Sequence, residues 1–254
     1  MMFDQAILQN FRPVSLNEMD AAELLDRTDT KYVFHANLLQ AVLENLSNDY
    51  RILEVNGMRP CRYESLYYDY DDFAFYKMHH NGRGNRIKVR YRHYETTDKY
   101  FFEVKRKTNK GRTIKKRIPS VTLETEMNAD QKLFFEKWTK LNPALLKPTV
   151  ETDFTRITLV KKDFSERVTF DYQLSFKYSD SVKNFDNIVI AEVKQSHYDY
   201  NSPVIKFLKL KHIIPRSISK YCWGVISLNN SVKSNMFKKQ LHEINKMLIK
   251  TEQI

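Results

Sequence analysis

Glycine is scarce in this chain. The 254 residues include five glycines, and none of them falls in a GxxxxGK[ST] or GxGxxG pattern. Glycine-rich loops of these two kinds hold phosphates with backbone N–H groups, so P-loop and Rossmann nucleotide sites are excluded. A phosphate ligand of this protein would have to be bound by side chains.

Cysteines and long apolar runs are also few. Cys61 and Cys222 lie far apart, no CxxC motif is present, and no signal peptide is recognisable, so we expect reduced thiols in a cytoplasmic protein. The seven histidines show no metal-ligand spacing and there is no GxSxG motif, which leaves zinc and serine-hydrolase chemistry unsupported. No apolar run approaches the roughly 20 residues that span a bilayer, so a membrane role would require a partner subunit.

Positive charge is abundant instead. Lysine and arginine number 42 against 31 acidic residues, which gives a net charge of +11 and a pI of about 9.4. Such an excess implies an anionic partner: nucleic acid, polyphosphate, a nucleotide or an acidic membrane surface. The composition is otherwise that of an ordinary globular protein, and no linker is visible, so we expect residues 1–254 to form a single domain.

The stretch from residue 86 to residue 118 carries the strongest pattern. Arg86, Lys88, Arg90 and Arg92 alternate with apolar or aromatic residues, a period of two that predicts a β-strand. Two further predicted strands repeat the pattern, with these polar residues on one face: Glu103, Lys105, Lys107, and then Thr113, Lys115, Arg117. A solvated face is the simpler interpretation, but solvated faces usually mix signs because like charges on neighbouring strands repel. We therefore predict the wall of an anion site.

Strands and helices alternate along the remaining chain. Strands are predicted at 27–34, 50–55, 62–69, 149–160, 167–178 and 187–195, and helices at 15–28, 37–46, 73–80, 130–141, 203–212, 217–228 and 231–250. The fold class is therefore α+β. A charged inner face on many antiparallel strands favours a closed sheet around a lumen, because closure removes exposed strand edges.

The predicted lumen would be strongly cationic. Buried like charges demand a polyanion, and phosphate oxygens suit arginine forks. Two carboxylates amid these cations suggest either a hard divalent ion that bridges carboxylate and phosphate, or charge compensation by salt bridges. The candidate phosphate-binding residues are Lys31, Arg90, Arg92, Lys105, Lys115, Arg156, Arg167 and Lys194, and the two carboxylates are Glu103 and Glu192.

A nucleic-acid partner is not expected. Proteins that bind single strands interleave aromatic side chains with cations on one exposed platform. Tyr91 and Phe102 instead alternate away from the cations, which indicates core packing.

Nine short motifs resemble one family. In chain order they are RTDTKY (27–32), LYYD (66–69), KVRYR (88–92), FEVKRK (102–107), TIKKR (113–117), TRIT (155–158), RVTFD (167–171), IAEVK (190–194) and SKYCWGV (219–225). Together the chain resembles the VTC (vacuolar transporter chaperone) polyphosphate polymerase domain of the triphosphate tunnel metalloenzyme (CYTH-like) superfamily.

The resemblance implies a closed, eight-stranded antiparallel tunnel with helices packed outside. It further implies that the cations hold ATP and inorganic polyphosphate, that Lys220 adds a cation from a helix, and that Glu192 binds Mn²⁺ or Mg²⁺. The implied reaction transfers the γ-phosphate of ATP to a growing polyphosphate chain. Such chemistry depends mainly on positioning and charge neutralisation.

The chain departs from the superfamily at its first motif. Hydrolase and cyclase branches open with ExExK, whereas Arg27 and Asp29 stand at the glutamate positions here. This departure disfavours a tripolyphosphatase or nucleoside triphosphatase, in which water would be the acceptor. A non-catalytic polyphosphate-binding protein is the remaining alternative. No phosphate-sensing SPX domain and no transmembrane segments are recognised, so regulation and export cannot be inferred.

Overall fold

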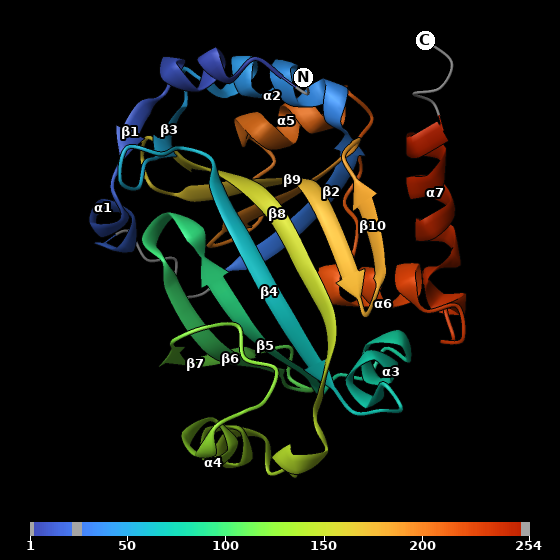
Figure 1. Cartoon of the computed structure of the whole chain (residues 1–254). Coiled ribbons are helices and arrows are strands. Elements are labelled where there is room, and N and C mark those ends of the chain that lie inside the picture. Colours follow the sequence, from blue (N-terminus) through green and yellow to red (C-terminus); the bar gives the residue numbers. More distant parts are fainter. Residues whose placement is uncertain (1–2, 22–26, 250–254) are drawn as a thin grey trace.

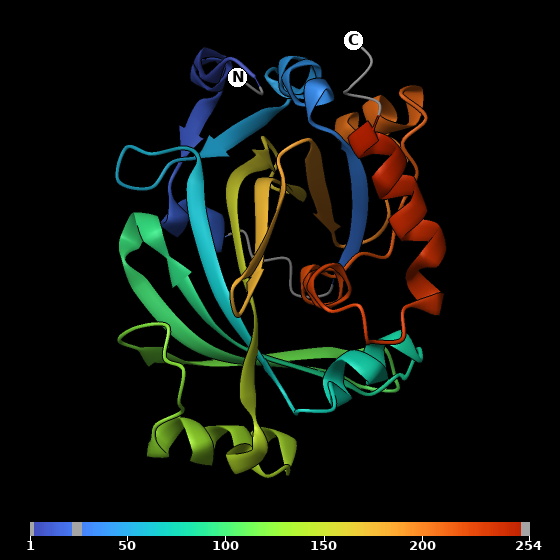
Figure 2. The ribbon, with the colours of Figure 1, turned by 45° about the vertical axis from the view of Figure 1, so that its right-hand side comes forward.

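The computed structural model describes residues 3–21 and 27–249, in which an antiparallel sheet curves around a central space and carries helices on its outside (Figures 1 and 2). The long strands are β2 (Thr28–His35), β4 (Cys61–Asp69), β5 (Arg86–Tyr94), β6 (Lys99–Lys107), β7 (Thr113–Ser120), β8 (Lys147–Lys161), β9 (Glu166–Tyr178) and β11 (Ile188–Gln195). Three short strands are β1 (Arg12–Val14), β3 (Tyr50–Leu53) and β10 (Ser181–Phe185).

Seven α-helices are described. They are α1 (Leu16–Ala21), α2 (Leu39–Leu46), α3 (Ala74–His80), α4 (Ala129–Thr139), α5 (Pro203–Leu210), α6 (Lys220–Leu228) and α7 (Lys238–Ile249). Within residues 3–21 and 27–249, none of the helices is both long enough and apolar enough to cross a bilayer.

The eight long strands follow one another in the hydrogen-bonded order β2-β11-β9-β8-β4-β5-β6-β7. Every neighbouring pair on this path is antiparallel. The α+β class and the eight-stranded antiparallel sheet are thus confirmed. Closure by hydrogen bonds is not: among the described residues no backbone pairing joins β2 to β7, so the sheet keeps a seam between its two end strands. The prediction of one domain over residues 1–254 stays a prediction.

Two predicted helices have different bounds in the structure. The helix predicted at 15–28 begins as expected, with Ser15 N–H donating to Glu18 Oε2 over 2.9 Å, but residues 22–26 lie outside the described part and Thr28 already belongs to β2. Thr28 pairs with Gln195 of β11, so sheet hydrogen bonds replace the helical ones there. The helix predicted at 231–250 starts only at Lys238, after a 3-10 turn at Asn235–Phe237.

The hydrophobic cores lie mainly outside the curved sheet. Helices α2 and α5 cover the outer face of β2, β11, β9 and β8, where Phe34, Leu43 and Val168 are buried (Figure 1). Helix α4 covers the outer face of β4, β5 and β6, where Tyr91 and Phe102 are completely buried. Because side chains alternate along a strand, burying the apolar set outside turns the cationic set inward.

Helix α6 packs on the inner face at one end of the central space (Figure 2). The Tyr221 ring stacks on the Tyr67 ring of β4, with centroids 5.1 Å apart, and the Trp223 ring contacts the Phe176 ring of β9. Gly224 is the next residue of α6, and a Cβ atom added there would approach Val150 Cγ1 of β8 to 2.6 Å. The missing side chain therefore allows α6 to approach β8 closely.

A substitution tests this close packing. Replacing a helix-interior glycine with alanine normally stabilises a protein by ~1 kcal/mol. At Gly224 we expect the opposite, a loss of about 1–3 kcal/mol in the free energy of unfolding, because the added methyl group overpacks the site. Urea denaturation of Gly224→Ala measures the change. A more stable variant would contradict the close approach of α6 to β8.

Candidate functional site: a cation-lined interior

The register of β5, β6 and β7 sets like charges directly opposite one another. Lys88 pairs with Lys105, and Lys105 pairs with Lys115, so one ammonium group from each strand lies on the same inner face. Like charges directly opposite on a sheet are destabilising. Burial lowers the pKa of all three lysines. The pKa of Lys105 falls to about 8, and the positive charge of Lys88 is the second cause of that shift. We call these three residues the lysine row.

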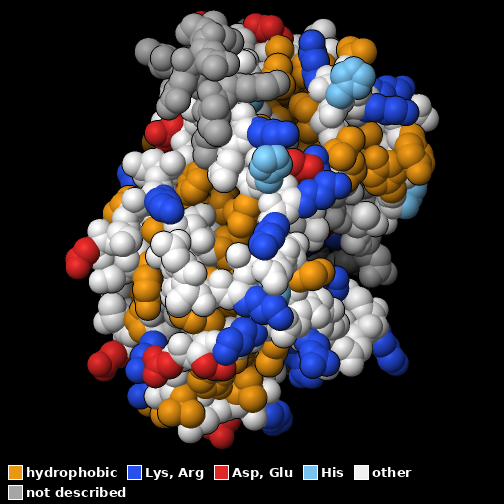
Figure 3. Space-filling model, turned by 90° about the vertical axis from the view of Figure 1, so that its right-hand side faces the viewer, with side chains coloured by type: hydrophobic (Ala, Val, Ile, Leu, Met, Phe, Trp, Pro, Cys, Tyr) orange, Lys and Arg blue, Asp and Glu red, His pale blue; other side chains and the backbone are white. Residues whose placement is uncertain are grey.

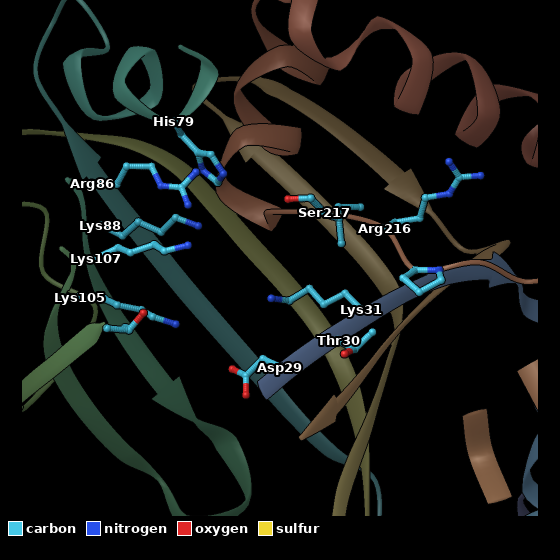
Figure 4. A pocket seen from close by; sticks show the side chains of 13 residues that line it. Asp29, Thr30, Lys31, His79, Arg86, Lys88, Lys105, Lys107, Arg216 and Ser217 are labelled. Atoms are coloured by element: carbon cyan, nitrogen blue, oxygen red, sulfur yellow. The ribbon is translucent and has the colours of Figure 1, made fainter. Parts of the chain in front are cut away.

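A cavity of about 470 Å³ opens beside the lysine row (Figure 4). Asp29 is the single carboxylate among the described residues that line it. The cations come from β2, β5, β6 and the loop before α6, and they are Lys31, Arg86, Lys88, Lys105, Lys107 and Arg216. Such a cavity suits a ligand with several negative charges.

The seam between β2 and β7 holds a second cavity of about 490 Å³. It shares Asp29, Lys105 and Lys107 with the first cavity and adds Arg27, Arg112 and Lys115. The cationic interior is therefore accessible through the side of the sheet as well as at its end. On the face seen in Figure 3, lysine and arginine side chains also follow one another down the middle of the surface.

A third cavity, of about 430 Å³, is lined by other predicted residues. Arg156, Arg167 and Lys194 line it together with aromatic side chains such as Tyr63 and Phe101. Arg167 donates from Nη2 to the Met19 carbonyl oxygen over 3.0 Å, which connects β9 to α1. This cavity thus combines cations with an apolar, aromatic wall.

Arg90 and Arg92 point inward, as predicted. Arg90 donates to Glu103 Oε2 from Nε and Nη2 at 2.8 and 2.7 Å, and from Nη1 to the Tyr67 hydroxyl at 3.0 Å. Arg92 is 8% exposed and donates from Nε to Ser65 Oγ over 3.0 Å. Burial, followed by the charge of Arg90, lowers the pKa of Arg92.

Glu103 compensates charge in this structure. Its side chain is 2% exposed and lies between Arg90 and Lys115, whose Nζ is 2.5 Å from Glu103 Oε1. Burial alone would raise the pKa of Glu103, but the charges of Arg90, Arg92 and Lys115 outweigh burial and lower it. Since both carboxylate oxygens already meet cations, the geometry supports the salt-bridge alternative over a metal ligand.

Glu192 has a more open environment. Its oxygens lie 2.9 Å from Lys31 Nζ and 2.6 Å from Lys194 Nζ, and Lys194 Nζ also lies 3.1 Å from Asp29 Oδ2. The two ammonium groups outweigh burial and hold the pKa of Glu192 well below its usual range. The structure therefore places two carboxylates, Glu192 and Asp29, around Lys194, and of these Asp29 lines the first cavity.

Asp171 orders the remaining cations, and the sequence analysis did not single it out. Arg156 makes a bidentate contact with it, with distances of 2.5 Å (Nε to Oδ1) and 2.8 Å (Nη2 to Oδ2), and Lys220 at the start of α6 donates to Oδ2. Asp171 pairs with Arg156 across β8 and β9, so strand register was the signal that could have revealed it. Asp171 thereby brings Lys220 and Arg156 together.

Other residues at the site were missed or undervalued. Arg86 and Lys88 belong to the alternating pattern but were not chosen as candidates, although both line the first cavity. His79, at the end of α3, also lines it, and no sequence motif indicates this. In the described part of the chain, no three His, Cys, Asp or Glu side chains gather closely enough to hold a metal ion by themselves. A bound metal would need ligands from a substrate.

The lysine row predicts an unusual pH dependence. The pKa of Lys105 is about 8 in the folded protein and near 10.4 in an unfolded chain. Between these values the unfolded state binds more protons, so Lys105 makes stability rise as the pH increases from 8 to 10. We expect Lys105→Met to be more stable than wild type at pH 7 in low salt, and the difference to shrink by pH 10. Urea denaturation at several pH values measures it.

The exposed Lys206 on α5 provides the matched control. Lys206→Met should not give the pH-dependent gain in stability that Lys105→Met gives. A Lys105→Met effect that does not change with pH would contradict repulsion within the lysine row.

This chain is similar to several solved structures. A protein of Hippeastrum, described as an adenylyl cyclase candidate with a dominant triphosphatase activity, superimposes with a TM-score of 0.51 at 11% identity, over 80% of this chain and 96% of that chain. An adenylate cyclase candidate from Vibrio parahaemolyticus reaches a TM-score of 0.46 at 13% identity, over 77% and 95%. At such low identity the first likeness concerns the fold alone.

The sequence comparison is more specific. No curated protein sequence matches the chain. The VTC domain family, in contrast, matches residues 26–229, which include every strand from β2 to β11 and helix α6. This chain belongs to the VTC domain family.

Proposed function

We propose that this protein is a polyphosphate polymerase, which transfers the γ-phosphoryl group of ATP to the end of an inorganic polyphosphate chain inside the cation-lined interior. The observation that carries this proposal is the lysine row, Lys88, Lys105 and Lys115. Glu103 pairs with Lys115, and a bound polyanion would relieve the repulsion that remains within the row. Membership of the VTC domain family supports the same ligand class.

The cavities suggest how the two substrates are arranged. The cavity of about 430 Å³ offers aromatic side chains, including Tyr63, Tyr94 and Phe101, beside Arg156 and Lys194. The base of a nucleotide can stack on aromatic rings while the phosphates of the nucleotide contact cations. We therefore assign the nucleoside of ATP to this cavity. The cavity of about 470 Å³, with its six cations, then receives the polyphosphate chain.

The residues of the site supply charge and orientation. The guanidinium groups of Arg90, Arg92 and Arg156 can each donate two hydrogen bonds to phosphate oxygens, whereas the lysines contribute point charges. The terminal phosphate of the acceptor is already anionic, so its oxygen can attack the γ-phosphorus without a protein base. The bond from that phosphorus to the β–γ bridging oxygen breaks, and ADP leaves with the electron pair.

Glu192 is the residue that we assign to a divalent metal, Mn²⁺ or Mg²⁺. Its carboxylate faces Lys31 and Lys194. These two flexible cations can release the carboxylate and bind phosphate oxygens instead. Mg²⁺ is commonly held by one or two carboxylates plus substrate phosphates, which fits the donor set. When bound, the ion would neutralise charge on the transferring group. Glu103 remains a counter-ion in this scheme.

The cytoplasmic location and a membrane partner subunit stay predictions.

Product analysis tests the reaction. With ATP and Mn²⁺, purified protein should produce ADP together with long phosphate chains that resolve on a gel, and little orthophosphate. The cations hold the end of the growing chain next to the γ-phosphorus, so the terminal phosphate should outcompete water as the acceptor. Stoichiometric orthophosphate without chains would instead identify a triphosphatase, and binding without turnover would identify a non-catalytic polyphosphate-binding protein.

The metal assignment is tested by Glu192→Gln. This change keeps the shape of the side chain and removes its charge, so we expect turnover to fall by about 100-fold or more. Metal-free polyphosphate binding should persist, as measured by calorimetry. Glu151→Gln, a half-exposed surface carboxylate paired with Lys177, is the matched control and should keep full activity. Full activity of Glu192→Gln would remove the metal role.

A further inference from the structure

His79 is the one imidazole among the described residues that line the cavity of about 470 Å³. It occupies the last turn of α3 and points toward the cations of β5 (Figure 4). None of the roles assigned above uses this side chain.

The partner of His79 fixes its tautomer. His79 Nδ1 lies 2.9 Å from Sγ of Cys222, a residue of α6 that is 1% exposed. Burial raises the pKa of the Cys222 thiol, so the thiol keeps its proton, and we assign its S–H group as the hydrogen-bond donor to Nδ1. The neutral imidazole then carries its own proton on Nε2, the nitrogen left to donate to a ligand.

Positive charges surround His79 from several elements. Arg86 and Lys88 face it from β5, Lys107 from β6, Lys31 from β2 and Arg216 from the loop before α6. The acid lining this cavity, Asp29, is bound to Arg27 and Lys194, and Phe237 of the 3-10 turn presents an aromatic ring. On α3 itself, Lys77 pairs with Asp72, and His80 contacts Asn81. Burial, followed by the charges of Lys88, Arg86, Lys107 and Lys31, lowers the pKa of His79 to about 3.

We propose that His79 is a phosphate-binding residue that takes up a proton from solvent when a polyphosphate chain fills this cavity. The inference rests on the function proposed above. A bound chain brings about one negative charge per phosphate, which reverses the sign of the charge around the imidazole and favours the imidazolium form. The imidazolium then donates from Nε2 to a phosphate oxygen and from Nδ1 to Cys222 Sγ, and the thiol turns from donor to acceptor.

A nucleophilic role for the same pair does not fit. A reactive cysteine is a partly exposed thiolate with a lowered pKa. Cys222 is enclosed and its pKa is raised, although Lys88 lies near it. The thiol therefore serves as the hydrogen-bonding partner that allows both charge states of His79.

Nuclear magnetic resonance of protein with ¹⁵N-labelled histidine tests the proposal directly. Ring ¹⁵N shifts separate the two neutral tautomers from the imidazolium, and His79→Gln identifies the His79 signals. Free protein at pH 6 should show the neutral Nε2–H form, and saturation with long-chain inorganic polyphosphate should convert it to the imidazolium. His197, an exposed residue outside the cavity, is the internal control.

Affinity provides a second readout. Between pH 7.5 and pH 5.5 the wild-type affinity for long-chain polyphosphate should increase several-fold more than that of His79→Gln, which keeps a donor but cannot be protonated. Protonation of the terminal phosphates of polyphosphate changes the affinity of wild type and of His79→Gln equally. The pKa of Lys105, at about 8, lies above this range, so Lys105 is already mostly charged throughout.

The outcomes separate the two proposals. If calorimetry shows that the chain binds while His79 stays neutral, the inference is wrong and the proposed function stands. If wild-type protein binds no polyphosphate, the proposed function fails and the inference fails with it. An imidazolium signal in the bound state, together with the loss of extra affinity in His79→Gln, would support the inference.

Discussion

Repulsion between the cations of the interior is the constraint on which this structure depends. Lys88, Lys105 and Lys115 are held opposite one another by strand register, so the folded chain keeps charges together that would separate in an unfolded one. Each such like-charge pair opposes folding, and salt weakens the repulsion because Lys105 and Lys115 are exposed to solvent. A protein retains this arrangement when a ligand of opposite charge completes it.

The position of the hydrophobic cores makes that constraint tolerable. Most apolar side chains of the strands lie on the outer face, under α2, α4 and α5, while a further core packs beneath α6 on the inner face. A few wholly buried side chains, such as Phe102 and Val168, contribute about 1.5–3 kcal/mol each. The interior is thus free to hold charge and solvent, and one apolar element, α6, closes part of it.

The buried carboxylates neutralise only part of the positive charge of the interior. Glu103 neutralises the middle of β5 and β7, Asp171 joins Arg156 to Lys220, and Glu192 joins Lys31 to Lys194. Each carboxylate serves two cations, so every acid leaves a net positive charge beside it. This pattern orients the arginine forks in the absence of ligand and limits the reorganisation that phosphate binding requires.

The sequence by itself determined the strands of residues 86–118 and the common face of Arg90, Arg92 and Lys105, because a period of two places alternate side chains on one face. The number of eight antiparallel strands followed from the resemblance to the VTC polyphosphate polymerase domain. Long-range packing decided the rest. Whether β2 meets β7 depends on how strongly the sheet curves, and no local pattern encodes that. Lys220 meets Asp171, and His79 meets Cys222, only because helices distant in the chain pack there, and pairing with Arg90 and Lys115 makes Glu103 a counter-ion. Local alternation is a short-range property, whereas these contacts depend on how strands pair and how helices pack on them.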